Sequence, residues 1–252
     1  MRVFKYFNDY ISIKKDDIFL VSYPKSGNTR FRLAIAKYIE LKGEIPNNEF
    51  NYEFVNNSMP ELGKGNINSA RKILKNNSRL AQFPLFIKSH LPFSSLKYFH
   101  NKNRNILIER LAPETMMSYY DYAKARGFIN QLNFSDFLRN KKMGIKAHVK
   151  FINSWLPKTH VSIDYEELIH NDEDVILNAL EKLNVKFDKG VMSEAIVQTR
   201  REKATKFENK KDNLNYNFAA KKKRELDDYF SKEDILYYNK QIKNTPLIPI
   251  SL

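Results

Sequence analysis

A lysine, two hydroxyl side chains and a glycine lie together in YPKSGNT, residues 23–29, between an apolar run and a helix-forming stretch. The backbone N–H groups of a tight turn that opens a helix can bind an anion. Lys25 would add a positive charge there, and Ser26 and Thr29 would add hydrogen-bond donors. The segment is not a Walker A loop, because such a loop places its lysine after the last glycine. An ordinary strand-to-helix turn without a ligand is the alternative.

Further side chains with useful chemistry also follow apolar runs. His90 lies in KSHLP, and a histidine at the end of a strand can act as a general base near neutral pH. Arg110 and Ser118 are eight residues apart, and a guanidinium together with a hydroxyl suits a phosphate group. Taken singly, His90 could equally be a surface residue, and Arg110 could simply pair with Glu114.

These polar clusters need a fold that brings them together. The apolar pattern predicts strands at residues 18–23, 84–87, 105–108 and 161–163, and helices at 31–43, 113–127 and 171–184. Strands that alternate with helices indicate an α/β fold of three layers, with a central parallel sheet flanked by helices. Ligands of such sheets bind beyond the carboxyl ends of the strands, where each cluster lies. We expect a single domain over residues 1–252.

The chain carries a large excess of positive charge. Its 43 Lys and Arg against 29 Asp and Glu give a net charge of +14, which suits an anionic partner such as a nucleotide, a nucleic acid, an acidic polymer or a membrane surface. The excess could equally be solvated surface, and we interpret the run Lys221–Arg224 as a solvated helix face. The chain has no cysteine, which excludes disulfide and thiolate chemistry. The histidines show no metal-ligand spacing, so no metal is expected.

Together the segments resemble the sulfotransferases that use 3′-phosphoadenosine 5′-phosphosulfate (PAPS). YPKSGNT resembles their 5′-phosphosulfate loop, usually YPKSGTTW, and KSHLP resembles their K-[ST]-H-L-P segment. The run from Arg110 to Tyr120 resembles R-N-P-K-D-x-x-x-S-Y-Y, with the proline one residue later. DYEEL at Asp164–Leu168 resembles Y-E-D-L, and Ser154-Trp155 resembles the S-W that precedes it. The resemblance covers roughly residues 16–230 and implies the P-loop-like sulfotransferase fold.

The resemblance implies a PAPS-dependent sulfotransferase that releases 3′-phosphoadenosine 5′-phosphate (PAP) and uses no metal. His90 would take the proton of the acceptor during an in-line transfer. Lys25 and Lys88 would stabilise charge on the transferring and leaving groups. The resemblance places the donor on the following residues: Lys25, Ser26, Gly27, Asn28 and Thr29 at the 5′ end, Arg110 and Ser118 at the 3′-phosphate, and Tyr165 and Thr199 near the adenosine.

The sequence departs from the family pattern at several positions. Asn28 replaces the usual threonine, and Arg30 replaces a tryptophan that stacks on adenine, a role that a planar guanidinium can also fill. The C-terminal R-K-G-x-x-G-D-W-K segment has no clear counterpart. Its positive contact to the 3′-phosphate would come from Lys206, Lys210 or Lys211.

Two other functions stay open at this point. An atypical P-loop nucleotide phosphotransferase or kinase would need Mg²⁺ and an acidic ligand at a strand end, for which Asp164 is the candidate. A non-catalytic basic module that binds a polyanion would show salt-sensitive affinity and no defined pocket.

For the sulfotransferase we expect a small-molecule acceptor with a hydroxyl or a nitrogen, and neither a nucleic-acid nor a membrane partner. Its pocket should be formed by residues 44–79, read as loops and short helices, and by loops near Phe93 and Phe128. No apolar stretch reaches the length of a signal peptide or the ~20 residues of a membrane span, so a cytoplasmic location is expected. The sequence leaves the oligomeric state open.

Overall fold

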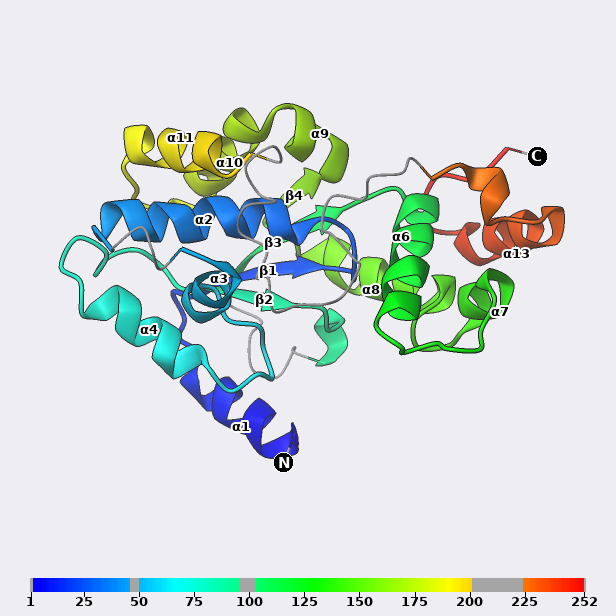
Figure 1. The fold of residues 1–252 in the computed structure, drawn as a ribbon, viewed down its shortest axis with the longest axis horizontal. Coiled ribbons are helices and arrows are strands. Elements are labelled where there is room, and N and C mark those ends of the chain that lie inside the picture. The colour runs from blue at the N-terminus through cyan, green and yellow to red at the C-terminus, as the bar shows by residue number, and fades with distance from the viewer. Residues whose placement is uncertain (1, 46–49, 96–102, 201–223, 252) are drawn as a thin grey trace.

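A four-stranded parallel sheet lies at the centre of the structure (Figure 1). This computed structural model describes residues 2–45, 50–95, 103–200 and 224–251. The strands are β1 (Ile18–Ser22), β2 (Phe86–Ser89), β3 (Arg104–Glu109) and β4 (Val161–Asp164), in the spatial order β2-β1-β3-β4. Parallel neighbours need a crossover connection, and these crossovers carry helices that cover the sheet.

Helices surround the sheet on both sides. The α-helices are α1 (Arg2–Ser12), α2 (Asn28–Lys42), α3 (Tyr52–Ser58), α4 (Ile67–Lys75), α6 (Ala112–Ala125), α7 (Phe134–Arg139), α8 (Ile145–Trp155), α9 (Tyr165–His170), α10 (Asp172–Lys182), α11 (Lys189–Gln198) and α13 (Lys232–Ile242). Short 3₁₀ turns are η2 (Phe93–Ser95), η3 (Leu156–Lys158) and η5 (Leu226–Asp228). In Figure 1, α2, α10 and α11 lie above the sheet and α1 and α4 below it, while α6, α7 and α13 lie on the right, where β1 points.

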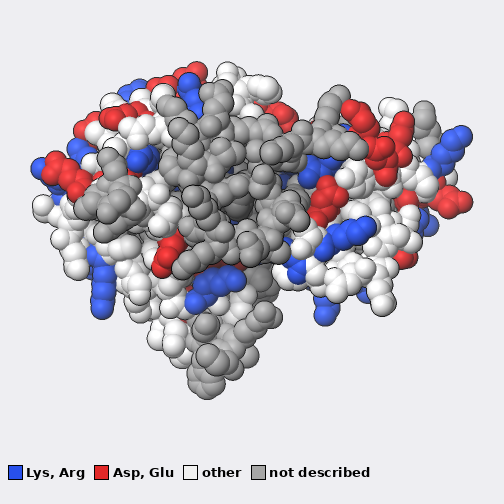
Figure 2. Space-filling model, viewed as in Figure 1, with Lys and Arg blue, Asp and Glu red and all other residues white. Residues whose placement is uncertain are grey.

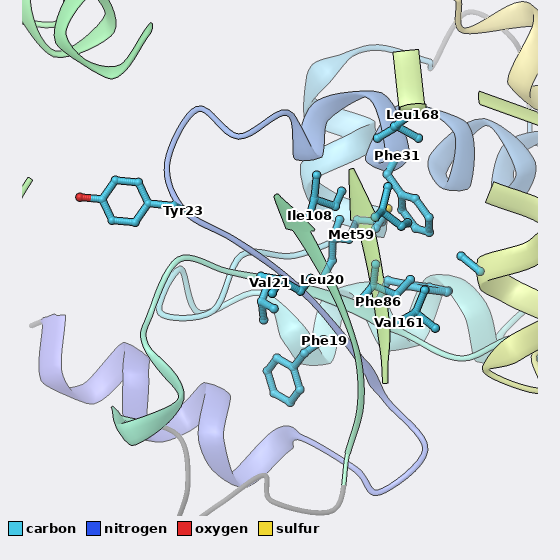
Figure 3. Close-up of a cluster of buried hydrophobic side chains, with 14 of the residues drawn as sticks. Phe19, Leu20, Val21, Tyr23, Phe31, Met59, Phe86, Ile108, Val161 and Leu168 are labelled. Atoms are coloured by element: carbon cyan, nitrogen blue, oxygen red, sulfur yellow. The ribbon is translucent and has the colours of Figure 1, made fainter. Parts of the chain in front are cut away.

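The central strand explains how the site is held in place. Every residue of β1 is buried, which is the pattern of a strand covered on both faces. Figure 3 shows Phe19 of β1 on the opposite side of the strand from Phe31 of α2. Tyr23, just past the end of β1, points away from this cluster. The strand is therefore fixed by packing on both sides, and so is the start of the loop that follows it.

The predicted α/β fold, with a parallel sheet between helices, is confirmed. Three strands match the prediction within one residue, whereas β2 begins two residues later than expected. Pro84 has no N–H group to give to the ladder, and pairing starts where Ile18 donates to the carbonyl oxygen of Leu85 at 2.9 Å. The predictions do not include α1, α7 or α8.

Helix ends follow the expected signals in part. α2 begins at Asn28, earlier than predicted, so the loop enters the helix directly, and Gly43 forms its C-cap as expected. Asn171 occupies the predicted N-cap of α10, although its side chain makes no capping bond. Within the described ranges, no helix has the length and apolar character needed to cross a membrane.

Candidate active site at the carboxyl edge of the sheet

The residues predicted to do chemistry follow strands that end at one edge of the sheet. The register of the parallel strands aligns their carboxyl ends, so the segments that follow the strands start side by side. Lys25, His90, Arg110 and Tyr165 each stand within three residues of a strand end. The fold thus brings to one edge four side chains that are spread over much of the sequence.

The loop after β1 has an unusual backbone. Lys25 has φ 70° and Gly27 has φ 95°, both in the left-handed region. A Cβ atom at Gly27 would overlap the ring of Tyr165, which lies directly against the glycine. Position 27 therefore requires glycine for its backbone angle and for the close approach of Tyr165. Because left-handed geometry is costly for a side chain such as that of Lys25, the surrounding packing must hold the loop.

Several cations surround the ammonium group of Lys25. Burial, together with the positive charges of Arg224, Arg110 and Lys88, lowers the pKa of Lys25 to about 8. The ammonium lies 4.9 Å from the centre of the Tyr122 ring. Cations gathered in a partly buried position favour an anionic ligand, which would offset their mutual repulsion.

Lys88 lies in the last part of β2, and His90 directly follows the strand. The ammonium of Lys88 lies 2.8 Å from the carboxylate of Glu61, and burial lowers the pKa of this lysine. Nδ1 of His90 lies 2.7 Å from the carbonyl oxygen of Ser22. Because a carbonyl oxygen accepts and cannot donate, Nδ1 carries the hydrogen and Nε2 presents a lone pair. Burial and the charge of Lys88 lower the pKa of His90 to about 3.

Arg110 and Tyr165 contact each other at the ends of β3 and β4. The guanidinium of Arg110 lies 4.4 Å from the centre of the Tyr165 ring. Arg110 also forms the ion pair with Glu114 that its position suggests, at 2.9 Å. Ser118 is buried two turns into α6. The same tyrosine ring thus touches both Gly27 and Arg110.

Arg30 lies on α2 with its guanidinium buried. It pairs with Asp172 at the start of α10, and it donates to the carbonyl oxygen of Ile196 at 2.9 Å and to the hydroxyl of Thr199 at 3.0 Å. Arg200 contacts the same Asp172 at 3.1 Å. The guanidinium of Arg30 therefore joins α2, α10 and α11, and stacking on adenine stays a prediction for it. The structure does place Arg30 and Thr199 next to each other.

The other residues of the loop have varied surroundings. The amide nitrogen of Asn28 donates to the hydroxyl of Ser22 at 2.9 Å, so this side chain faces the end of β1. Ser26 is buried and Thr29 is half-buried. Lys206, Lys210 and Lys211, which were expected to replace the C-terminal motif, lie outside the described residues.

The structure adds residues that the sequence analysis missed. Tyr122 and Arg126 follow Ser118 by one and two helical turns, and the guanidinium of Arg126 lies 5.5 Å from the centre of the Tyr122 ring. Their spacing of four residues could have assigned them to the Ser118 face of the helix. Glu61, the partner of Lys88, comes from a loop-rich segment in which no spacing pattern marks it.

The interpretation of Lys221–Arg224 as a solvated helix face is wrong for Arg224. This residue stands outside a helix, and its side chain is 16% exposed. It donates to Asp121 of α6 at 2.7 Å, and the hydroxyl of Tyr229 donates to the same carboxylate at 2.9 Å. The compensating carboxylate lets Arg224 lie in the interior, where its charge acts on Lys25. The preceding three lysines lie outside the described residues.

A cavity of about 320 Å³ lies beside His90. Among the described residues its walls come from the loops after β1 and β2, from the turn before α8 and from the first part of α8. The loop near Phe93 contributes Pro92, as expected, whereas no residue of 44–79 and none of the loop near Phe128 is found in this lining. The turn before α8 carries no motif, so the sequence analysis did not single it out.

Comparison with known proteins agrees with this architecture. The structure resembles mouse sulfotransferase SULT7A1 in complex with PAP, at 18% identity and a TM-score of 0.62, over 92% of this chain and 86% of that chain. It also resembles retinol dehydratase in complex with retinol and PAP, at 18% identity and a TM-score of 0.61, over 98% of this chain and 87% of that one. At this identity the likeness shows the fold, which is that of the sulfotransferases. A search of curated protein sequences returns no match.

A family model identifies the chain from its sequence. The model of the sulfotransferase domain matches residues 15–244, which include each of the strands and loops described above. The chain therefore belongs to the sulfotransferase domain family.

Proposed function

We propose that this protein is a PAPS-dependent sulfotransferase that moves the sulfuryl group of PAPS to a hydroxyl or a nitrogen of a small acceptor. The observation that carries the proposal is the convergence of Lys25, Lys88 and Arg110 with a neutral His90 at one edge of the sheet. The family membership supports the sulfuryl transfer. The bound PAP in SULT7A1 and in retinol dehydratase, which share the fold, supports the donor.

The residues fit a nucleoside with phosphates at both its 3′ and 5′ positions. The N-cap of the 15-residue helix α2 is Gly27, which has no side chain to cap the first-turn N–H groups. We infer that these N–H groups bind the 5′-phosphate together with Ser26 and Thr29. Arg110 and Ser118 hold the 3′-phosphate. The ring of Tyr165 touches both Gly27 and Arg110, so the two proposed phosphate sites would share one aromatic neighbour.

The side chains divide the work of an in-line transfer. The bound donor supplies a sulfur whose bond to the 5′-phosphate oxygen breaks, and that oxygen leaves with the electron pair. Nε2 of His90 takes the proton from the acceptor atom as this atom bonds to the sulfur. Lys25 and Lys88 stabilise the negative charge on the sulfuryl oxygens and on the leaving phosphate.

The low pKa of His90 suits a base that is deprotonated before the reaction. In the free protein its pKa of about 3 keeps the imidazole neutral at physiological pH. An anionic donor beside Lys25 and Lys88 offsets their positive charges, and it thereby raises the pKa of His90 towards the ordinary value. A base with a pKa near the working pH is the most effective in general base catalysis.

Two observations disfavour the other functions. The carboxylate of Asp164, the candidate metal ligand of a phosphotransferase, accepts from the backbone N–H groups of Glu166 at 2.9 Å and Glu167 at 3.0 Å, and so caps α9. Where described residues are visible on the face in Figure 2, Lys and Arg are interspersed with Asp and Glu, and these residues form no continuous basic surface of the kind that a polyanion-binding module presents. A cytoplasmic location stays a prediction.

Calorimetry tests the donor site directly. We expect PAP to bind much more tightly than adenosine 5′-phosphate, without Mg²⁺, and Arg110→Ala to abolish this preference because the 3′-phosphate loses its guanidinium. His90→Ala should bind PAP normally while turnover falls on the order of 10²–10⁴. His170→Ala, on the exposed end of α9, is the matched control and should leave both unchanged. Equal affinity for the two nucleotides would contradict the proposal.

A further inference from the structure

The cavity beside His90 is lined by an unusual set of side chains. Its apolar lining consists of Tyr23, Pro92, Ala147 and Phe151, close to the candidate base. The rest of its lining consists of four lysines: Lys141, Lys142, Lys146 and Lys150. A volume of about 320 Å³ is at the lower end of the range for small-molecule sites. The composition is that of an apolar pocket with a strongly cationic side.

The lysines come from one short stretch of chain. Lys141 and Lys142 stand in the turn before α8, and Lys146 and Lys150 are one helical turn apart on α8. All four are exposed. Within the described ranges, no carboxylate lies within 4 Å of any of their ammonium groups. Like charges one turn apart repel each other, so an anion bound between them would be favoured.

The buried acidic side chain of the helix that packs on α8 is paired with groups other than these lysines. Asp234 of α13, a helix that packs on α8, is held by Arg139 and accepts from the hydroxyl of Ser231 at 2.8 Å. The first turn of α8 contains no acidic residue, although acids are the usual choice at that helix end. The positive charge of the cavity is therefore not neutralised by the elements described around it.

The lysine-bearing turn is fixed to the chemical centre. The hydroxyl of Tyr23, two residues before Lys25, donates to the carbonyl oxygen of Met143 at 2.8 Å. Gly144 packs so closely that a Cβ atom would overlap the carbonyl oxygen of Leu138. The ring of Tyr23 also packs edge-on against His148 of α8, with ring centres 4.8 Å apart. The backbone that carries the lysines therefore keeps a set position relative to the loop after β1.

We propose that the acceptor is a small molecule with two features: a nucleophilic hydroxyl or amine, and a separate anionic group such as a carboxylate or a phosphate. The lysines bind the anionic group, Tyr23 and Phe151 contact the body of the molecule, and the nucleophile meets His90. The step is the transfer already described: the acceptor atom bonds to sulfur, its proton goes to Nε2, and PAP leaves. This inference rests on the proposed function, which it deepens by naming the substrate class.

Matched phenols test the inference with labelled PAPS and the full-length protein. We expect kcat/KM for 4-hydroxyphenylacetate and for 4-hydroxyphenethyl phosphate to exceed that for 4-ethylphenol about tenfold or more, and tyramine to be the poorest of the series. The triple variant Lys142→Gln, Lys146→Gln, Lys150→Gln should remove this preference, so that the anionic phenols react no faster than 4-ethylphenol, while the KM for PAPS stays that of the parent protein. Lys182→Gln with Lys186→Gln, on exposed positions of and after α10, is the control for surface charge and should keep the preference.

Binding to the PAP complex provides a second measurement that does not depend on turnover. In calorimetry with saturating PAP, the carboxylate and phosphate phenols should bind more tightly than 4-ethylphenol, and the triple variant should lose the difference. Any of four results would overturn the inference. The anionic phenols and 4-ethylphenol could bind with equal affinity, or none of the phenols could bind. The triple variant could change the KM for PAPS, or the protein could sulfate only a polymer such as heparin. If the protein does not bind PAP, the proposed function is wrong. If it binds PAP normally but shows no preference for anionic phenols, only the proposed acceptor class is wrong.

Discussion

The ammonium group of Lys88 lies 2.8 Å from the carboxylate of Glu61, which stands in the segment between α3 and α4. The two residues also form a parallel β-bridge, so backbone pairing holds the carboxylate in place. Glu61 thus brings a negative charge next to residues that we expect to stabilise an anion. It reduces the cost of burying Lys88, and at the same time it competes with a ligand for that lysine.

We expect Glu61→Gln to strengthen the binding of anions at this edge. Removal of the competing carboxylate frees the charge of Lys88, which should raise the affinity for PAPS about fivefold at low salt, a change of about 1 kcal/mol. Calorimetry with PAP and the KM for PAPS would measure the effect. Glu53→Gln makes the same change in net charge at an exposed position of α3. Similar gains in both variants would show that net charge, rather than Lys88, is responsible.

Gly27→Ala should damage both the fold and the donor site. The left-handed φ of 95° alone costs an alanine about 1–3 kcal/mol, and the new methyl group also displaces the ring of Tyr165. We expect the free energy of unfolding in urea to fall by about 2 kcal/mol or more, and PAP binding to weaken strongly. Gly190→Ala is the control, since the nearest atom to its Cβ is 3.7 Å away. A stable Gly27→Ala protein with normal PAP affinity would contradict the close packing described for Tyr165.

His148 should make the protein sensitive to acid. Burial lowers its pKa to about 3, and within the described part of the chain neither ring nitrogen has a hydrogen-bond partner. Between pH 3 and pH 6.5 the unfolded chain binds a proton that the folded chain does not, so the free energy of unfolding falls as the pH drops through this range. At pH 5 the loss from this residue is about 2 kcal/mol.

His148→Phe should remove that part of the pH dependence. Urea unfolding at pH 7.5 and pH 5.0 would measure it, and the difference between the two values should shrink by about 2 kcal/mol relative to the parent protein. A phenylalanine can keep the edge-on contact with Tyr23. His170→Phe, at an exposed position, should leave the difference as it was. If His148→Phe shows the same difference between the two pH values as the parent protein, the imidazole of His148 is already protonated in the folded state at pH 5.

Arg30→Met should test whether Arg30 is mainly a structural residue. Among the described residues, the substitution leaves buried Asp172 paired with Arg200 alone, and it should lower the free energy of unfolding by about 3 kcal/mol. Arg200→Met removes the other, half-exposed partner and should cost less than about 1 kcal/mol. We expect Arg30→Met with Asp172→Asn to recover part of the loss. If Arg30→Met keeps full stability and loses PAP affinity, the guanidinium acts on the nucleotide instead.

The sequence predicted those site residues whose place in the fold follows from their position directly after a strand. Lys25, His90, Arg110 and Tyr165 each follow a short apolar run, and one rule about parallel sheets brings such positions to a common edge. The same reasoning located the strands, because buried strands are continuous apolar runs. The helix face that carries Ser118 could also have been extended to Tyr122 and Arg126.

The partners of these residues could not be predicted, because they depend on tertiary contacts between distant segments. Arg30 meets Asp172 across 142 positions of sequence, and no spacing pattern in the sequence marks this buried ion pair. Arg224 meets Asp121 across 103 positions, which removes it from the solvated run to which it was assigned. No spacing pattern marks Glu61 or the lysines before α8, since their roles arise from the packing of loops.

The four lysines beside the cavity are exposed, whereas Ile145, Phe151 and Ile152 of α8 are buried. Substitutions on the outer face can therefore be tolerated with little loss of folding stability. Acceptor preference can diversify there during evolution, or be redesigned in the laboratory, while the machinery for sulfur chemistry at the sheet edge stays under strict constraint.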